Sequence, residues 1–188
     1  MKNQKNLSVV KLYFAQCVFN HKILEKAAER LRLKIKLFFY VNLFFLIIGL
    51  ILIILPTFIK NWSSNIFLIA SQFFLVIGIT SVLIKYFFAF DKQEIDCNNA
   101  AKEFLHLRDL YINLIVDILN EVNTEQILIK KNDFIERYRI ICSLSPKTCQ
   151  KDYQKAQKSL FGKTNYGEEF TWSEEQINML LPKGLQKK

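Results

Sequence analysis

The sequence predicts an all-α membrane protein, in which a two-span transmembrane helical hairpin extends into a cytoplasmic, antiparallel, coiled-coil-like helical bundle. Two apolar runs, 37–59 and 66–84, contain no charged residue. Each is long enough to cross the roughly 30 Å hydrocarbon core of a bilayer. Only residues 60–65 separate the runs, so the spans must be antiparallel neighbours joined by a short outside loop. Residues 37–90 therefore form the predicted hairpin.

The segment before the hairpin, residues 1–36, is predicted to form a basic amphipathic helix. Its apolar positions recur in alternating steps of four and three, which is the pattern of a coiled-coil seam. The stripe contains Val10, Phe14, Cys17, His21, Leu24, Ala28, Leu31, Ile35 and Phe38. No Gly or Pro interrupts it, so we expect this helix to continue directly into the first span.

A matching stripe follows the second span, in a cytoplasmic helical region predicted over residues 91–162. It contains Cys97, Ala100, Phe104, Leu107, Tyr111, Leu114 and Ile118. Counted down both helices from the membrane surface, residue 10 lies opposite about residue 112. The two helices are therefore expected to pair antiparallel below the membrane, with later helices or a second subunit covering the remaining apolar surface.

The rest of the cytoplasmic region is predicted to form shorter helices. Asn123-Thr124 indicates a break, and Asp133 with Glu136 resembles a capping box that opens a new helix. Ser145-Pro146 is typical of a cap followed by proline at the first helical position, and Gly162 is expected to end that helix. No stretch has the alternating pattern of a strand.

Residues 163–188 are predicted to form a linker and a short C-terminal helix that ends at Pro182. This helix carries an aromatic and several aliphatic side chains. It is therefore a candidate docking element, either within its own subunit or on another chain. The candidate docking residues are Trp172, Ile177 and Leu180.

The net charge of +9 is concentrated before the first span: residues 1–36 hold nine Lys or Arg and two Glu, whereas residues 86–188 hold fifteen of each sign. By the positive-inside rule, both termini of this multi-pass chain should be cytoplasmic. We expect no signal peptide, because the first apolar run is too long and lacks a cleavage site. Nucleic-acid binding is the alternative explanation of a basic segment. The candidate contacts to anionic lipids are Lys26, Arg30, Arg32, Lys34 and Lys36.

The polar residues within the spans allow two interpretations. Small and hydroxyl side chains on one helical face favour close packing of helices. In an oligomer the same face could line a polar path, with Lys85 at its cytoplasmic mouth. Two spans cannot enclose such a path, so a pore requires several copies. The candidate pore-lining or helix-packing residues are Asn42, Ser71, Gly78, Ser81 and Lys85.

No catalytic, cofactor-binding or metal-binding residue is predicted, and the protein is not expected to be an enzyme or to act on a small-molecule substrate. The pattern contains no phosphate-binding loop and no nucleophile–base pair. The four cysteines fit no metal-ligand spacing and are expected to be reduced thiols: Cys17, Cys97, Cys142 and Cys149. His21 lies on the apolar seam, as a structural residue or a pH-sensitive switch, and His106 is expected to be solvated.

The order of these elements resembles the SLATT family of small bacterial two-span effectors. A basic helix leads into span one, a very short loop follows, and span two leads into a long helix. The segments that carry the resemblance are AAKEFLHLRDLYINLIVDIL (100–119), FIERYRIICSLSPKT (134–148) and KDYQKAQK (151–158). The resemblance covers about residues 18–160 and includes no catalytic signature.

The resemblance implies an oligomeric effector of the bacterial inner membrane that permeabilises the bilayer or forms a pore in it. The expected setting is an anti-phage, abortive-infection type of defence system. The implied partners are the lipid membrane, further copies of the chain, and a nucleotide-signal synthase, a sensor or a reverse transcriptase encoded nearby. The alternative is a non-enzymatic membrane anchor or scaffold that presents a helical partner-binding module. A small transporter, or a subunit of a membrane enzyme, is a further alternative that two spans without an intramembrane acid disfavour.

Overall fold

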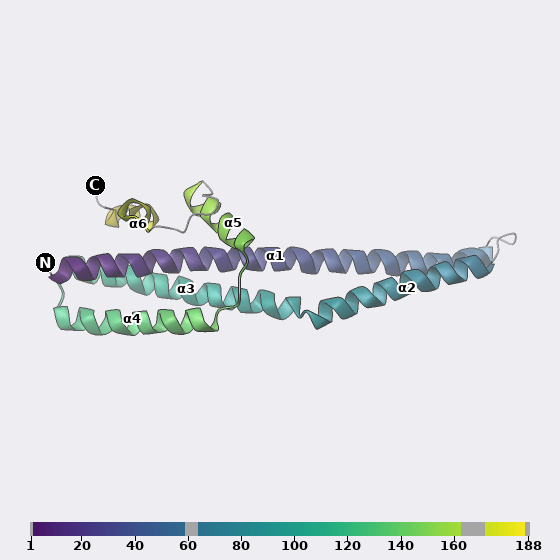
Figure 1. Ribbon diagram of the computed structural model, residues 1–188, viewed down its shortest axis with the longest axis horizontal. Coiled ribbons are helices and arrows are strands. Elements are labelled where there is room, and N and C mark those ends of the chain that lie inside the picture. Colours follow the sequence, from purple (N-terminus) through teal and green to yellow (C-terminus); the bar gives the residue numbers. More distant parts are fainter. Residues whose placement is uncertain (1, 59–63, 163–171, 187–188) are drawn as a thin grey trace. The chain divides into compact units, whose positions relative to one another are not determined.

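The computed structural model describes residues 2–58, 64–162 and 172–186, and these parts are helical apart from short connecting turns (Figure 1). Most of the predicted loop 60–65 and linker 163–169 lies outside these residues. No strand occurs in the described parts, as predicted. The helices are α1 (Lys2–Phe58), α2 (Ser64–Phe87), α3 (Phe90–Leu119), α4 (Thr124–Leu144), α5 (Gln150–Phe161) and α6 (Glu174–Leu180), followed by a 3₁₀ turn, η1 (Lys183–Leu185).

The chain forms two compact units. We call residues 1–28 with 95–188 the bundle unit, and residues 29–94 the hairpin unit. The two long helices α1 and α3 each contribute to both units. The predicted continuation of the basic helix into span one is confirmed, because α1 is a single helix of 57 residues.

The core of the bundle unit is formed by the two predicted stripes of α1 and α3. Their buried members include Val10, Phe14, Cys17, Leu24, Cys97, Phe104, Leu107, Tyr111, Leu114 and Ile118. The rings of Tyr13 and Tyr111 stack with centroids 6.1 Å apart, and His21 Nδ1 lies 3.0 Å from the Ala101 carbonyl oxygen. These contacts confirm the antiparallel pairing. Ala101, rather than the predicted Ala100, is the buried alanine of α3.

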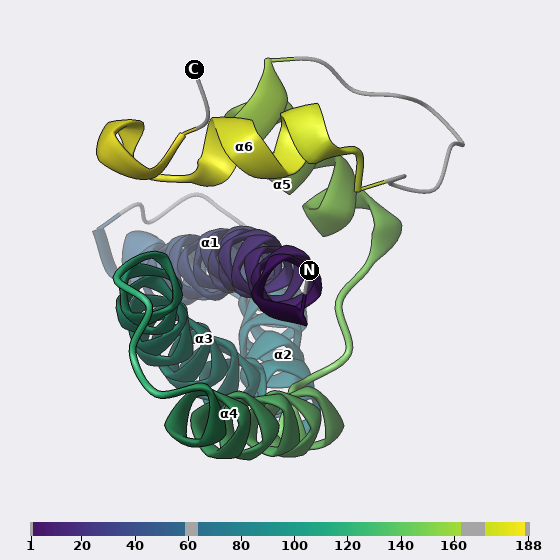
Figure 2. The same cartoon turned by 90° about the vertical axis from the view of Figure 1, so that its left-hand side faces the viewer.

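A second face of α1 is also buried, which the seam pattern did not predict. Ala15, Phe19 and Ala27 are at most 3% exposed. Phe19 makes edge-on contacts with Tyr153 of α5, at 5.0 Å, and with Trp172 before α6, at 5.6 Å. Within the bundle unit α5 and α6 therefore lie on the opposite side of α1 from α4 (Figure 2).

The prediction of a new helix at Asp133 is wrong. Residues 124–144 form one helix, α4, whose N-cap is Asn123 with its side chain accepting from the Glu125 amide. Asp133 instead pairs with Arg137 one turn later, at 2.9 Å, on the exposed surface. An acidic residue followed by a second one three positions later forms a capping box only where the first residue has a non-helical backbone. Here the apolar positions Ile127 and Phe134 keep the helix packed across that point.

The start of α5 was also predicted too early. Ser145 is the C-cap of α4, and α5 begins only at Gln150. Cys149 is its N-cap, and the buried Asp152 carboxylate accepts from the Cys149 amide at 3.1 Å. Proline restricts the residue before it to extended backbone, which ended α4 without starting the next helix. The predicted end is confirmed, because Gly162 adopts a left-handed φ of 70°.

The hydroxyls of two tyrosines in the bundle unit, Tyr111 and Tyr138, differ in their hydrogen bonding. Tyr138 accepts a hydrogen bond of 3.0 Å from Asn20 Nδ2, whereas the buried Tyr111 hydroxyl finds no partner among the described residues. A buried hydroxyl without a partner destabilises the fold by the cost of its lost hydration.

We therefore predict that Tyr111→Phe raises the free energy of unfolding by about 1 kcal/mol, since it removes an unsatisfied hydroxyl and keeps the ring. The matched variant Tyr138→Phe should lower it by about the same amount, since Asn20 loses its partner. Thermal unfolding of the detergent-solubilised full chain, followed by circular dichroism, measures both. A loss of stability in Tyr111→Phe would contradict this account of the core.

Candidate functional site

The hairpin unit contains two helices that are long and apolar enough to cross a membrane. Their apolar side chains point outward: of the 18 most apolar consecutive residues, 6% are buried in the first helix and 11% in the second. The core helix of a soluble protein would instead bury most of these side chains. The exposed positions include Leu43, Phe44, Ile47, Ile51, Phe73, Val76 and Leu83.

The two spans touch where their side chains are smallest. Gly49 of α1 is buried, and a Cβ added there would lie 3.1 Å from Leu75 Cδ2 and 3.5 Å from the Ser71 carbonyl oxygen of α2. Ser71 is 1% exposed, and its hydroxyl donates to the Leu68 carbonyl within its own helix at 2.8 Å. This is the close approach of backbones that small residues allow.

A second contact lies further along the same pair of helices. A Cβ added at Gly78 would lie 3.3 Å from Leu46 Cδ2 and 3.5 Å from Asn42 Oδ1. The Ser81 hydroxyl is 2.7 Å from the Gly78 carbonyl oxygen and 3.4 Å from Asn42 Oδ1. In the described parts of the two spans, the Ser81–Asn42 contact is the only polar one between side chains of different spans. In the apolar surroundings of the spans, these contacts satisfy groups that lipid would leave without partners.

The structure thus places four of the five predicted span residues at the two contacts between the spans, with Ser71 at the first and Asn42, Gly78 and Ser81 at the second. In a single chain this face is filled by packing. Lys85 is separate from it: its ammonium lies 3.1 Å from Asp91 Oδ2, beyond the end of α2. Of the other polar span residues, Gln72 and Thr80 are exposed, and Thr80 donates to the Val76 carbonyl at 2.8 Å.

A sharp break separates α2 from α3, where the sequence predicted a direct continuation. Phe88 and Ala89 form a turn, and Ala89 has a φ of 46°, in the left-handed region that costs a side-chain-bearing residue roughly 1–2 kcal/mol. The Gln93 side chain donates to the Phe88 carbonyl at 2.9 Å. The ring of Phe90 stacks on Phe38 of α1, with centroids 5.7 Å apart. We call this turn with its contacts the α2–α3 junction.

Charged residues surround the junction. Arg32 donates from two guanidinium nitrogens to Glu94 Oε1, at 2.9 and 3.2 Å, and the Lys34 ammonium lies 5.5 Å from the centroid of the Phe90 ring. Of the other predicted lipid contacts, Lys36 is exposed, Arg30 is partly buried in the hairpin unit, and Lys26 is partly buried in the bundle unit. Arg30 and Lys26 both interact with other groups. The five cations thus differ in their availability to headgroups.

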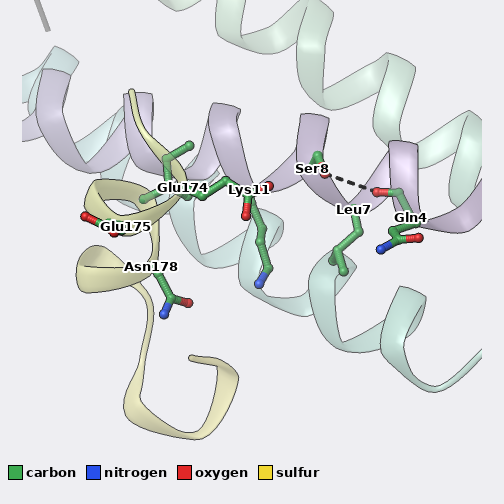
Figure 3. A pocket seen from close by; sticks show the side chains of 8 residues that line it. Gln4, Leu7, Ser8, Lys11, Glu174, Glu175 and Asn178 are labelled. Carbon is green, nitrogen blue, oxygen red and sulfur yellow. Dashed lines mark hydrogen bonds between the residues drawn. The ribbon is translucent and has the colours of Figure 1, made fainter. Parts of the chain in front are cut away.

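The predicted docking residues lie against their own chain. Ile177 is 9% exposed, Leu180 is partly buried, and Trp172 contacts Phe19. A hollow of about 310 Å³ remains between α6 and the first turns of α1 (Figure 3). Gln4, Leu7 and Lys11 line it from α1, and Glu174 lines it from α6.

The remaining titratable groups of the bundle unit have no arrangement typical of catalysis. Burial raises the pKa of the Cys17 thiol and of the Tyr111 and Tyr138 hydroxyls well above their usual ranges. Burial also raises the pKa of Cys142, although its hydrogen bond with Tyr138 opposes the change. All these groups are held in their neutral forms. No group of three or more metal-binding side chains occurs in the described residues.

Two structural features of the hairpin unit escaped sequence reasoning. The partners of the glycines, Leu46 and Leu75, are ordinary members of apolar runs and carry no distinguishing signal. The α2–α3 junction does have one, because Asp91 is an acid of the kind typical of a first helical turn. Its position shortly after Lys85 was sufficient to suggest a new helix start.

The fold and these contacts define a class: an all-α protein with a two-helix membrane hairpin and an attached helical bundle. The chain belongs to the SMODS and SLOG-associating 2TM effector domain family 4, whose family model matches residues 7–175. The expected SLATT resemblance is thereby confirmed, over a longer stretch than predicted. This is a family of membrane effector domains of defence-associated systems and not a known enzyme family. Comparisons with curated proteins and with solved structures find no match.

We predict that Gly49→Val separates the spans, because its Cβ alone would already be 3.1 Å from Leu75. The measurement is disulfide formation between Asn42→Cys and Ser81→Cys, in a full-length chain whose native cysteines are replaced by alanine. We expect rapid cross-linking, slowed about tenfold or more by Gly49→Val, since a well-packed contact tolerates little extra volume. The matched control Ile47→Val, at an exposed site, should cross-link normally. Equal rates in both variants would contradict the contact.

We also predict an order of thiol reactivity in the native protein. Alkylation requires the thiolate, and a raised pKa lowers the thiolate fraction at a given pH. Cys17, buried and with a raised pKa, should resist iodoacetamide at about pH 8 until the protein is unfolded. Exposed Cys149 should react first, and Cys142 more slowly. Peptide mass spectrometry measures the order, and early labelling of Cys17 would refute the packing of α1 against α3.

Proposed function

We propose that this protein is a homo-oligomeric effector that permeabilises the bacterial inner membrane in an anti-phage, abortive-infection type of response. The observation that carries the proposal is the hairpin unit, whose apolar side chains face outward along both spans, in a chain that belongs to a two-transmembrane effector family. Outward apolar side chains need lipid or other spans as partners.

Both termini lie in the cytoplasm in this proposal. The basic residues before α1 enters the membrane and Lys85 after α2 leaves it support that orientation, because cations are retained on the cytoplasmic side. The exposed rings of Tyr40 and Tyr86 belong to the type of residue that is enriched at membrane interfaces. Anionic headgroups would contact the available cations, above all Lys36.

Permeabilisation requires several copies and a rearrangement. The polar face of each hairpin is occupied by its own packing, so a single hairpin offers no path. In an assembly, the contact of Ser71, Gly78 and Ser81 with α1 is broken. The three residues then contact another copy or line a water-filled path. The α2–α3 junction is suited to drive this exchange, because its ion pair and stacked rings hold a strained turn between the span and the bundle.

The trigger in this proposal is a partner that binds the bundle unit in only one of its two states. A nucleotide-signal synthase, a sensor or a reverse transcriptase encoded nearby is the expected type of partner. Binding shifts the population by its differential affinity for the two states, and it requires no catalytic residue in the effector itself.

A membrane tether is the second candidate, and the packed hairpin favours it. Asn42, Gly49, Gly78 and Ser81 form a complete two-helix contact, which is all that an anchor needs. An anchor would present the bundle unit to a partner without changing the permeability of the membrane.

Membrane potential and dye entry in cells that express the full chain distinguish these candidates. We predict depolarisation with the wild type, alone or together with the neighbouring genes, and a strong reduction in the double variant Ser81→Leu, Lys85→Glu. Ser81 is 8% exposed, so leucine there disturbs the hairpin contact, whereas the control Thr80→Leu lies on the outer surface and should remain active. Intact membranes under both conditions, with the protein inserted, would support the tether.

A further inference from the structure

A groove runs between α3 and α4 on the outer side of the bundle unit. It consists of two adjoining hollows of about 280 and 500 Å³, which share Glu103, Ile140 and Ile141. Two aliphatic side chains beside it are exposed to an unusual degree: Ile140 is 49% and Leu144 is 79% exposed. Large aliphatic side chains gathered in a groove mark a surface that another chain covers. We call it the α3–α4 groove.

One edge of the groove is acidic. Asp96, Asn99 and Glu103 line it from α3, and all three are exposed. In the described part of the chain, Asp96 and Glu103 form no ion pair, whereas Arg137 in the smaller hollow is paired with Asp133. Carboxylates repel the anionic headgroups that attract the basic end of the hairpin. The groove therefore suits a basic protein segment rather than the membrane surface.

Helix α5 of this chain presents such a segment. Lys151, Lys155 and Lys158 are exposed on its outer side, while Asp152 and Ala156 are buried on the opposite side. In the described part of the chain the three lysines form no ion pair either. Lysine stems cover apolar surface while their ammonium groups reach outward, so this face can lie along Ile140 and Leu144.

The spacing of the charges matches in one orientation. The lysines follow one another in steps of four and three, and Glu103, Asn99 and Asp96 follow in the same steps when α3 is read backwards. An antiparallel α5 therefore places Lys151 beside Glu103 and Lys158 beside Asp96. Each outer pair is seven residues apart, about 10.5 Å along either helix.

The two surfaces cannot meet within one chain. In both views α5 lies on the opposite side of α1 from α4 (Figures 1 and 2). We propose that α5 of one copy docks antiparallel along α3 in the α3–α4 groove of the next copy. This proposal rests on the oligomer of the proposed function and names its contact. Because the two surfaces differ, the contact is head to tail and repeats from copy to copy; such a repeat closes into a ring where the rotation between copies allows it and otherwise forms an open filament.

The contact sets the order of subunits rather than the whole affinity. A helix of 12 residues covers less than the roughly 800 Å² per partner of a typical stable interface. The outward apolar faces of the spans supply further contact once the copies share a bilayer. The charged pairs then select the neighbour and its direction.

Complementary charge reversal tests the proposal in detergent-solubilised full-length protein, with mass photometry and chemical cross-linking as readouts. The first variant is Lys151→Glu with Lys158→Glu, and the second is Asp96→Lys with Glu103→Lys. Each faces like charges in its own contacts, so we expect the dissociation constant to rise about tenfold or more. A one-to-one mixture of the two variants, and a chain with all four changes and the wild-type net charge, should both assemble normally. Lys5→Glu is the control for an exposed charge elsewhere on the unit.

Circular dichroism confirms that each variant keeps its helical content. Normal assembly of either two-residue variant overturns the proposed contact. So does a mixture or a four-residue variant that fails to assemble, because the pairing is then not the one described. A wild-type chain that remains monomeric at every concentration, in detergent and in lipid nanodiscs, overturns the oligomer itself and with it the proposed function.

Discussion

The contact between α1 and α2 at Gly49 and Gly78 is the constraint on which the membrane part of the structure depends. Two apolar helices gain little from each other's apolar surface in lipid, since lipid solvates that surface equally well. Their association requires close backbones and satisfied polar groups. The glycines allow the first, and Ser81 with Asn42 provides the second. Any polar path therefore has to be made by changing this contact.

The helix α1 contributes residues to both the bundle unit and the hairpin unit. After the second span the helix is interrupted, because the turn at Ala89 separates α2 from α3. Arg32 and Glu94 secure that turn from two different helices. In the function proposed above, this strained turn is the point at which a rearrangement of the spans would begin.

The fold was largely predictable because its signals are long and redundant. The span lengths, and the seams that include Phe14, Phe104 and Tyr111, gave the helices and their antiparallel pairing. Short-range signals failed where packing decided the outcome: Asp133 resembled a cap inside a continuous α4. The second buried face of α1, at Phe19, depends on α5 and on Trp172, which are distant in sequence. Four residues at the contacts between the spans were predicted together, whereas their partners Leu46 and Leu75 were not. Whether the four line a path or pack together depends on neighbours that sequence spacing does not specify.

The most direct test of the central claim is the leakage of a small dye from vesicles of bacterial lipids that contain the purified full chain. The claim is that packed hairpins permeabilise a membrane only as an assembly. The initial leak rate should therefore rise more steeply than in proportion to the protein-to-lipid ratio. Used singly, the variant Lys151→Glu with Lys158→Glu and the variant Asp96→Lys with Glu103→Lys should each leak in simple proportion to that ratio. A mixture of the two variants should restore the steeper dependence. A leak proportional to the amount of protein, or no leak at any ratio and with the partner proteins added, would contradict the account.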